Sequence, residues 1–567
     1  MEEIKYYDFR GVKVVDAFKI MYKSFSLLSS FLLFILLATA LCEIIVGNKI
    51  GLYISQLIND IVSSDNEKGK RFFKDILKNS GWMVLICLIL VFKKWIGERL
   101  SIILKSNLVK KIHEKYFEDN SFYELLIYDS EIDNPDARIT NDCSSWTSIF
   151  SEITTNIVQM PIYVVWYGIQ TEKQFNMYAI YFCVGFSLLG IILSRIALSP
   201  IVKLTKKLEA ANGDYRLANV LIKKNAESIA LSKAQKCEEN LITKRLESAL
   251  DIQTSLANHS LLLNIFSNGY YNFSNGLVYI CIYFCTPKGL TPAEIAKFIA
   301  RVAFIVGQFL SGLTMFTTIM QDFSKLCGHS TRIEELISTL GLHKEMIKES
   351  IVDNKVKMEN VDIIKPNSEL LIPNLTFEIN PTDSVFIEGQ SGCGKSSIFR
   401  ALSKIWPIGQ GQITIPHYNY KNLLVLTQSP YIPMGNLFEC CAFPLSLSEC
   451  YHDDIIQAIN FFELDYLLQR NTNNWQLSLS PGERQRIALC RILIHKPTFL
   501  LIDEGTSAIP QKLETKLYEW MKTSGISYIS IAHQSNIRKY HKYILKINDD
   551  KTYSYKLNTE WESHINL

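Results

Sequence analysis

The stretch GQSGCGKS, residues 389–396, decides the fold of the second half of this chain. It follows the apolar run SVFI (384–387) and precedes SIFRAL (397–402), which has the composition of a helix. A glycine-rich loop between a strand and a helix is the arrangement of a phosphate-binding P-loop, because the glycines let backbone N–H groups surround a polyphosphate at the positive end of a helix. The alternative, a chance glycine-rich turn, does not account for this strand–loop–helix context.

The loop predicts a nucleotide site in which two side chains have defined roles. Lys395 is expected to reach the outer phosphates of ATP, and the Ser396 hydroxyl is expected to ligate Mg²⁺. The residues of this stretch that we predict to contact the nucleotide are Gly389, Ser391, Gly392, Cys393, Gly394, Lys395, Ser396 and Ser397.

The composition of the 567-residue chain indicates membrane spans. Hydrophobic residues make up 48% and charged residues only 20%, which is too apolar for an ordinary soluble enzyme of this size. The net charge of +3 gives no indication of a nucleic-acid partner. The 13 cysteines are scattered without a C-x-x-C repeat, so neither a zinc site nor a disulfide framework is predicted.

Six apolar stretches are interpreted as spans, each of which needs about 20 residues. They lie at 25–46, around 82–92, and at 146–169, 175–198, 261–285 and 298–320. The basic segment 1–24 places the N-terminus in the cytosol, and the first run is too long for the alternative of a cleaved signal peptide. The charged stretches 95–142 and 199–258 are expected to be helices that continue into the cytosol.

The predicted fold is therefore an α-helical transmembrane domain of exporter type followed by an α/β P-loop ATPase domain. The predicted divisions are a cytosolic segment at 1–24, the six-span domain at 25–329, a linker at 330–355 and the ATP-binding domain at 356–567.

A second stretch, TFLLIDE (498–504), reads as an apolar strand that ends in two acids. Asp503 is expected to hold Mg²⁺ through water, and Glu504 to orient the water that attacks the γ-phosphate. The alternative is a strand that ends in acids by chance, which the presence of a P-loop makes a poor explanation.

The run LSPGERQR (479–486) precedes this strand and resembles the signature loop of ABC-type ATPases. The resemblance implies that Ser480, Gly482 and Glu483 contact a nucleotide held by a second subunit. Gln428, in LTQSP (426–430), resembles the glutamine that reaches Mg²⁺ in this family. The metal ligands implied in this way are Ser396, Gln428 and Asp503.

His533, in SIAH (530–533), resembles the switch histidine of the family and joins Glu504 as a predicted catalytic residue. A structural histidine after an apolar strand is the alternative. The chain also departs from the family pattern: Pro481 replaces a common glycine, SAIP (507–510) lacks an aspartate, and DIIK (362–365) has no aromatic residue to stack adenine. We expect weaker discrimination of adenine but intact hydrolysis.

One ATPase and one membrane domain make a half-transporter, so the resemblance implies a dimer, either with a second copy of the chain or with a related half-transporter. IDNPDARITND (132–142), GDYR (213–216) and NAESIA (225–230) resemble segments of subfamily D, the peroxisomal and lysosomal type. Within it, Pro481 and LTPAE (290–294) are most similar to the lysosomal branch that moves cobalamin.

These resemblances imply ATP-driven transport of cobalamin from lysosome to cytosol by an integral membrane protein of an organelle. The lysosome or endoplasmic reticulum is favoured over the peroxisome, and a membrane partner that delivers substrate or targets the chain is a further possibility. The main alternative is peroxisomal transport of long-chain fatty acids or acyl-CoA, for which Arg195, Lys297 and Arg301 are candidate phosphate ligands, although snorkelling or cavity-lining roles fit them better. More distant alternatives are a non-transport ABC ATPase and a membrane scaffold.

Overall fold

The computed structural model describes residues 19–22, 24–63, 68–128, 132, 134–174, 177–285, 289, 291–340, 347–351, 355–406, 409–417, 421–470, 472, 474–532 and 535–561. Contacts between residues divide the chain into two compact units. The first comprises Met1–Ser121 with Glu131–Gly341, and the second comprises Phe122–Ser130 with Leu342–Leu567.

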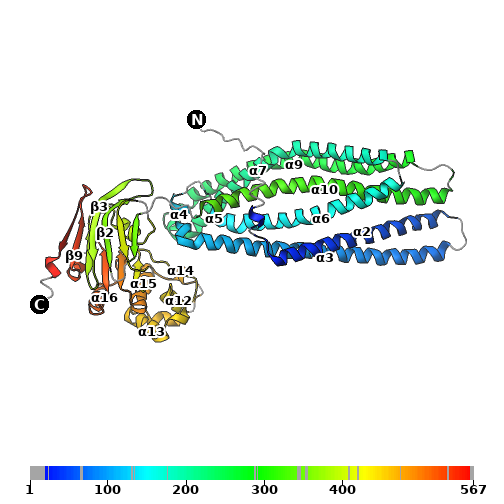
Figure 1. Ribbon diagram of the computed structural model, residues 1–567. Coiled ribbons are helices and arrows are strands. Elements are labelled where there is room, and N and C mark those ends of the chain that lie inside the picture. Colours follow the sequence, from blue (N-terminus) through cyan, green and yellow to red (C-terminus); the bar gives the residue numbers. More distant parts are fainter. Residues whose placement is uncertain are drawn as a thin grey trace. The chain divides into compact units, whose positions relative to one another are not determined.

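The first unit is a bundle of long helices. Among the described residues, six helices have 32 residues or more, and Figure 1 shows them running alongside one another. They are α2 (Leu27–Val62), α3 (Lys68–Phe117), α6 (Cys143–Gln174), α7 (Met177–Lys224), α9 (Gln235–Cys285) and α10 (Pro292–Thr339). Even the shortest measures about 48 Å, which exceeds the ~30 Å hydrocarbon core of a bilayer.

Each of the six predicted spans has its apolar centre in a different one of these helices. In the part of the chain that the structure describes, three helical stretches are long and apolar enough by composition to cross a membrane: Leu27–Val62, Gly69–Ile127 and Pro292–Thr339. The short elements of this half are η1 (Glu118–Asn120), α4 (Ser121–Tyr128), α5 (Pro135–Ala137), the π-helix η2 (Arg138–Asp142) and α8 (Ala226–Leu231).

A buried polar cluster joins α2, α3 and α6 at the level of the predicted spans. Glu43 Oε2 lies 2.6 Å from Lys93 Nζ, and Glu43 Oε1 accepts hydrogen bonds from Gln159 Nε2 and the Tyr163 hydroxyl, both at 2.9 Å. Lys93 Nζ also donates to Gln159 Oε1 at 2.9 Å. We call Glu43, Lys93, Gln159 and Tyr163 the polar node. Both charges need these partners, because an unpaired charge at membrane depth is costly.

A second polar cluster joins α2, α6 and α10. The Arg301 guanidinium donates to Asn48 Oδ1 at 2.6 Å and to Gln170 Oε1 at 3.1 Å. Asn48 follows Glu43 on α2, and Gln170 follows Tyr163 on α6, so the same two helices carry both clusters. The contact between α2 and α6 is therefore polar at two levels of the bundle.

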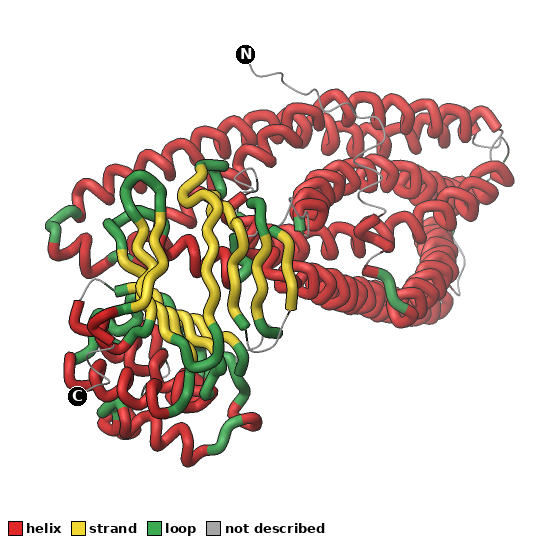
Figure 2. The backbone as a smooth tube through the Cα atoms, turned by 60° about the vertical axis from the view of Figure 1, so that its left-hand side comes forward, coloured by secondary structure: helices red, strands yellow, loops and turns green. Residues whose placement is uncertain are grey.

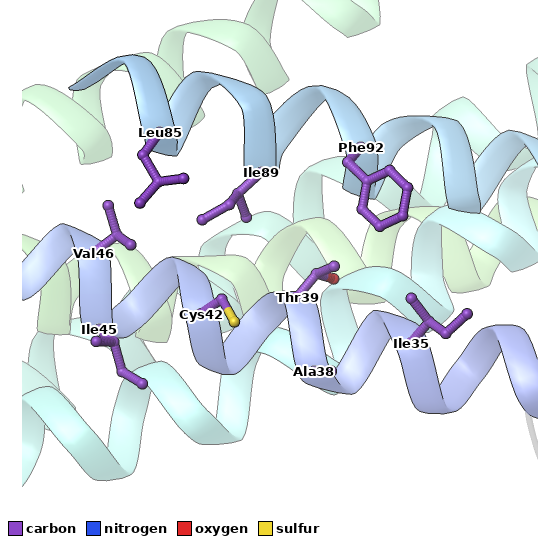
Figure 3. A pocket seen from close by; sticks show the side chains of 9 residues that line it. All are labelled: Ile35, Ala38, Thr39, Cys42, Ile45, Val46, Leu85, Ile89 and Phe92. Atoms are coloured by element: carbon purple, nitrogen blue, oxygen red, sulfur yellow. The ribbon is translucent and has the colours of Figure 1, made fainter. Parts of the chain in front are cut away.

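An apolar cavity of about 470 Å³ lies between α2 and α3. Figure 3 shows side chains of the two helices facing each other across it. Its lining comprises Ile35, Ala38, Thr39, Cys42, Ile45, Val46, Leu85, Ile89 and Phe92. The one hydroxyl among them, that of Thr39, donates to the backbone carbonyl of Leu36 at 2.8 Å. The cavity therefore suits hydrocarbon and offers little to a polar ligand.

The segment 132–142 is anchored to α10 by charge. Asp142 accepts a hydrogen bond from Arg332 Nε at 2.7 Å and pairs with His329 Nδ1 at 2.9 Å. Burial by itself would raise the pKa of Asp142, but the hydrogen bonds from His329 and Arg332 outweigh it and hold the pKa below its ordinary value. Arg138 donates to Glu335 on the next turn of α10 at 3.0 Å.

The same segment also contacts α7. Arg216 pairs with Asp136 at 2.8 Å, and a Cβ placed on Gly213 would lie 3.0 Å from the Asn134 side-chain nitrogen. The two segments 132–142 and 213–216, quoted above for their resemblance to subfamily D, therefore lie against each other. Their contact was not evident from the sequence because 80 residues separate the paired charges of Asp136 and Arg216.

The second unit contains two sheets. Their strand orders are β1-β5-β2-β3 and β10-β9-β4-β8-β7-β6, and Figure 2 shows the strands in yellow. The strands are β1 (Lys348–Ile351), β2 (Val356–Ile364), β3 (Leu370–Ile379), β4 (Ser384–Glu388), β5 (Gln412–Ile415), β6 (Leu423–Leu426), β7 (Phe499–Asp503), β8 (Ser527–Ile531), β9 (Tyr543–Ile547) and β10 (Tyr553–Leu557). In the six-stranded sheet, β9, β4, β8, β7 and β6 are parallel, and β10 is an antiparallel edge.

Helices cover the second unit's parallel sheet. They are α11 (Lys395–Leu402), α12 (Leu437–Ala442), α13 (His452–Phe461), α14 (Trp475–Ser478), α15 (Pro481–His495) and α16 (Gln511–Thr523), with short turns η3 (Leu447–Glu449), η4 (Asp465–Gln469) and η5 (Ser535–Tyr540). The central strands β4, β7 and β8 are buried and mostly apolar because both of their faces are covered. On β7, Leu500 and Ile502 enter one core, whereas Phe499 and Leu501 enter the other.

Residues 122–128 of α4 group with the ATPase rather than with the helical bundle. The Tyr123 hydroxyl accepts a hydrogen bond from Trp406 Nε1 at 3.1 Å and Tyr123 packs against the core that contains Trp406. The predicted domain divisions remain predictions. Within the predicted linker 330–355, α10 continues to Thr339 and β1 pairs with β5.

We predict that Lys93→Met lowers the stability of the protein by about 3–5 kcal/mol, because the substitution leaves the Glu43 carboxylate buried without its cation. The double variant Glu43→Gln/Lys93→Met should recover most of this loss, since the amide that replaces the carboxylate carries no charge. Unfolding of the detergent-purified protein measures both values, and Lys94→Met, at an exposed neighbour on α3, is the matched control. Equal stability of Lys93→Met and wild type would contradict the prediction.

We predict an acid-sensitive ATPase core from His541, which lies fully buried among Phe386, Tyr518 and Tyr528. Burial lowers the pKa of His541 to about 3, whereas the unfolded chain takes up the proton near pH 6.5. Above pH 6.5 His541 is neutral in both the folded and the unfolded chain, so it costs no stability. Below pH 6.5 the unfolded chain binds a proton that the folded chain does not, and the free energy of unfolding falls by about 1.4 kcal/mol per pH unit toward pH 3. His541→Phe should flatten the decline of the unfolding midpoint between pH 6.5 and 5; an unchanged slope would be the opposing result.

Candidate functional site

The P-loop lies at the carboxyl end of β4 and leads into α11. Gly392 and Gly394 have φ values of +87° and +106°, a region that residues with a side chain rarely adopt. A Cβ on Gly389 would come within 2.9 Å of the Ile547 carbonyl oxygen, so this glycine is needed for close packing. Lys395 Nζ donates to the carbonyl oxygens of Gly389 at 2.6 Å and Gln390 at 2.8 Å.

The loop residues that were predicted to contact nucleotide all lie in this loop and in the first turn of α11. The two hydrogen bonds to the Gly389 and Gln390 carbonyl oxygens hold the Lys395 ammonium over the loop. This is where the outer phosphates of a nucleotide are expected in a P-loop. Ser391 is exposed, whereas Ser397 is buried in the first turn of α11.

The structure brings Ser396 and Asp503 together. The Ser396 hydroxyl donates to Asp503 Oδ1 at 3.0 Å. Burial raises the pKa of Asp503, the hydrogen bond from Ser396 offsets part of the rise, and the negative charge of Glu504 adds to it. Hydroxyl and carboxylate oxygens are ligands that Mg²⁺ prefers, so this pair fits the metal of a magnesium nucleotide.

The structure also brings Gln428 and Glu504 together. Gln428 Nε2 donates to Glu504 Oε2 at 2.8 Å. Glu504 has φ +52°, and its N–H donates to the Ile531 carbonyl at 2.9 Å. A non-glycine residue in the left-handed region is strained, and such strain is concentrated at functional sites. The turn directs the Glu504 carboxylate away from β7 and toward the Gln428 segment.

Ser480 and Glu483 pair with each other at the start of α15. Ser480 Oγ accepts from the Glu483 N–H at 3.2 Å, and the Ser480 N–H donates to Glu483 Oε2 at 2.6 Å. This reciprocal cap satisfies two backbone N–H groups at the start of α15, and the Ser480 hydroxyl also lies against the Glu483 carboxylate. Pro481 occupies the first helical position, where the missing N–H would have no partner within the helix, so this departure from the family pattern suits a helix start.

Three of the predicted residues remain to be placed. Gly482 follows Pro481, and a Cβ there would lie 2.9 Å from the Ala508 carbonyl oxygen. Cys393 lies in the loop and would contact a Cβ on Gly389. His533 falls outside the described residues; β8, which precedes it, ends at Ile531.

Gln485 was quoted within the signature run but was not assigned a role. Its side chain contacts three segments of the site, and it is only 5% exposed. A signal was present in the sequence, since a polar residue at an inward position of an amphipathic helix needs a partner. What it contacts depends on loops that are distant in the sequence.

Comparisons with known proteins match both halves of the chain. The family model described as ABC transporter transmembrane region 2 matches residues 18–285, and the one described as ABC transporter matches residues 372–507. The human lysosomal cobalamin transporter ABCD4 is 27% identical, covering 94% of this chain and 94% of its own length. The chain is an ABC transporter of the D-family type.

Other relatives agree with this family. An uncharacterized ABC transporter ATP-binding protein of Synechocystis is 28% identical over 90% of this chain and 80% of its own length. Human ATP-binding cassette sub-family D member 3 is 26% identical over 87% of this chain and 81% of its own. A solved structure of a bacterial Atm1-family ABC exporter with ATP bound superposes with a TM-score of 0.78 at 17% identity, covering 98% and 97% of the two chains, which shows the fold.

The predicted fold class is thereby confirmed: a helical transmembrane region precedes an α/β ABC ATPase. As an ABC transporter of the D-family type, this integral membrane protein binds ATP and hydrolyses it to drive transport. One membrane region and one ATPase make it a half-transporter, an architecture that implies dimerisation.

We predict that Glu504→Gln lowers kcat for ATP hydrolysis by about 10²–10⁴-fold, because an amide cannot take up the proton of the attacking water. ATP binding should be retained, since the P-loop is untouched. Steady-state hydrolysis and equilibrium binding of a fluorescent ATP analogue measure the two effects. Glu519→Gln, at an exposed position of α16, is the control. Full hydrolysis by Glu504→Gln would remove Glu504 from its assigned role.

Proposed function

We propose that two copies of this chain form a homodimer that moves cobalamin from the lysosome to the cytosol, with ATP hydrolysis as the energy source. The observation that carries the substrate assignment is the match of 94% of this chain to 94% of the human lysosomal cobalamin transporter.

We propose that the hydrogen-bonded pairs Ser396–Asp503 and Gln428–Glu504 form the centre of the ATP site. Lys395 binds the outer phosphates, and Ser396, Asp503 and Gln428 hold Mg²⁺, which neutralises charge on the phosphates. Glu504 orients the attacking water and accepts its proton. The resemblance to the switch histidine assigns His533, which lies outside the described residues, a role toward the γ-phosphate. These roles rest on the hydrogen bonds Ser396–Asp503 and Gln428–Glu504 and on the family resemblance.

The dimer is proposed from the family resemblance, in which the signature residues act on a nucleotide held by a second subunit. Here these residues start α15, whereas the P-loop leads into α11. Ser480 and Glu483 cap α15, and Ser480 is exposed. In the dimer, Ser480 and the Gly482 N–H of one copy contact the nucleotide held by Lys395 of the other. A chain that stays monomeric in detergent and in lipid while hydrolysing ATP at full rate would contradict this arrangement.

The polar clusters of the bundle support a polar cargo. Charged groups at membrane depth are expensive and commonly mark the path of a polar substrate. The polar node and the Arg301 cluster supply amide, carboxylate and cationic groups on α2, α6 and their neighbours. Arg301, considered above as a phosphate ligand, already donates to two amide oxygens. Lys297 is exposed, and the side chain of Arg195 is outside the described residues.

One observation favours the second candidate, transport of long-chain fatty acids or acyl-CoA. The apolar cavity between α2 and α3 has the lining that an acyl chain requires (Figure 3). The compartment follows the substrate: we propose the lysosome or endoplasmic reticulum for cobalamin, where a membrane partner delivers substrate or targets the chain, and the peroxisome for acyl-CoA.

We predict ATP-dependent movement of labelled cobalamin in liposomes that contain the purified protein, and stimulation of its ATPase by cobalamin. Labelled long-chain acyl-CoA is the parallel arm, and Glu504→Gln is the control for ATP dependence. Movement of acyl-CoA without cobalamin would replace the first candidate by the second. Movement of neither, with intact ATPase activity, would contradict both substrates.

A further inference from the structure

Gln485 lies in the second turn of α15, where its side chain is almost completely buried. Its Nε2 donates to the carbonyl oxygen of Gln428 at 3.2 Å and approaches that of Glu504 at 3.5 Å. The same nitrogen lies 3.2 Å from Ser507 Oγ, and Oε1 accepts from the Ala508 N–H at 2.8 Å. One amide therefore contacts the Gln428 loop, the end of β7 and the loop that follows it.

These segments are the ones that hold the water-orienting carboxylate. The Gln428 side chain donates to Glu504 Oε2, and Gln485 holds the backbone of both residues. The Glu504 carbonyl also accepts from the Ser507 N–H at 3.2 Å. Because Glu504 has a left-handed φ, its backbone needs such contacts to stay in place.

A second observation ties α15 to the same loop. A Cβ on Gly482 would lie only 2.9 Å from the Ala508 carbonyl oxygen, so the first turn of α15 packs directly against the backbone at 508. Gly482 and Gln485 are three residues apart and lie on one face of the helix. A displacement of α15 must therefore move this loop or break its contacts.

The opposite end of this short helical segment carries Ser480. Gln485 follows the N-cap residue Ser480 by five positions, which corresponds to a rise of about 7.5 Å along α15. The reciprocal cap between Ser480 and Glu483 fixes the first turn. The Ser480 hydroxyl and the Gln485 amide are therefore joined by a short, capped stretch of helix. A shift of one side chain should move the other.

Only an amide satisfies this set of contacts. Glutamine offers two N–H hydrogens to carbonyl oxygens and one oxygen to a backbone N–H. A glutamate at this position would keep the acceptor for Ala508 but would face the carbonyl oxygens of Gln428 and Glu504 without a donor. Leucine would leave all of these buried groups without this partner, which is costly.

We propose that Gln485 is a positioning residue that links the two ATP sites of the dimer. Within one protomer, Ser480 serves the nucleotide of the other protomer, whereas Glu504 serves the protomer's own nucleotide; Gln485 joins these two ends. The inference rests on the proposed homodimer. When Ser480 contacts the nucleotide of the partner protomer, α15 and Gln485 change the position of Glu504, which acts on the protomer's own nucleotide.

The linkage is tested with mixed dimers of two differently tagged copies, purified by both tags. The reference dimer carries Glu504→Gln in one copy, so that only the other copy hydrolyses ATP. Gln485→Leu is then added either to the hydrolysing copy or to the Glu504→Gln copy. In the second arrangement the active Glu504 and its own Gln485 are unaltered, and only the α15 that presents Ser480 to the active site is changed.

We predict that both arrangements lower kcat by about tenfold or more relative to the reference, because each loosens one end of the link. Equilibrium binding of a fluorescent ATP analogue should stay within about twofold, since the P-loop is unchanged. Gln457→Leu, at an exposed glutamine of α13, is the matched control and should leave kcat at the reference value.

Loss of rate only when Gln485→Leu is in the hydrolysing copy would overturn the linkage and leave Gln485 as a local support of Glu504. Unchanged rates in both arrangements would overturn it as well. If Gln485→Leu fails to bind ATP, Gln485→Glu, which retains the acceptor for Ala508, takes its place with the same expectations. If the two tagged copies do not co-purify, both the homodimer and this inference are overturned. If a stable mixed dimer forms but loses rate only when Gln485→Leu is in the hydrolysing copy, the inference alone is overturned.

Discussion

The hydrogen bond between Ser396 and Asp503 exists because β4 and β7 leave the sheet at the same edge, with β8 between them. Parallel strands deliver whatever follows them to one edge, so the P-loop and the two acids converge there. Burial of the sheet on both faces makes this edge the place where polar groups of the strands can meet solvent and ligand. The remaining parts of the ATPase are arranged around this convergence, including the Gln428 loop and α15.

The helical bundle faces a different constraint, since charged groups at membrane depth must find partners within the protein. Glu43 and Lys93 meet this requirement in the polar node, and Arg301 meets it through Asn48 and Gln170. The polar node joins α2, α3 and α6, the Arg301 cluster joins α2, α6 and α10, and a separate apolar cavity lies between α2 and α3. The bundle thus combines polar contacts and hydrocarbon-like space in neighbouring layers, which is why both a polar and an acyl cargo can be considered for one fold.

Two further connections join segments that the sequence keeps far apart. Asp142 at the end of η2 is held by α10, and Tyr123 of α4 is held by Trp406 beside α11.

The sequence by itself determined the fold class, the family and the presence of a nucleotide loop, because glycine spacing, apolar run length and the order of motifs are local properties. The strand TFLLIDE and the loop GQSGCGKS already indicated which side chains meet. Only the tertiary structure decided that Glu43 pairs with Lys93 and that the side chain of Gln485 joins three loops. These contacts depend on how helices are rotated and how loops return to one edge. Long-range packing sets both, and no local pattern of residues encodes them.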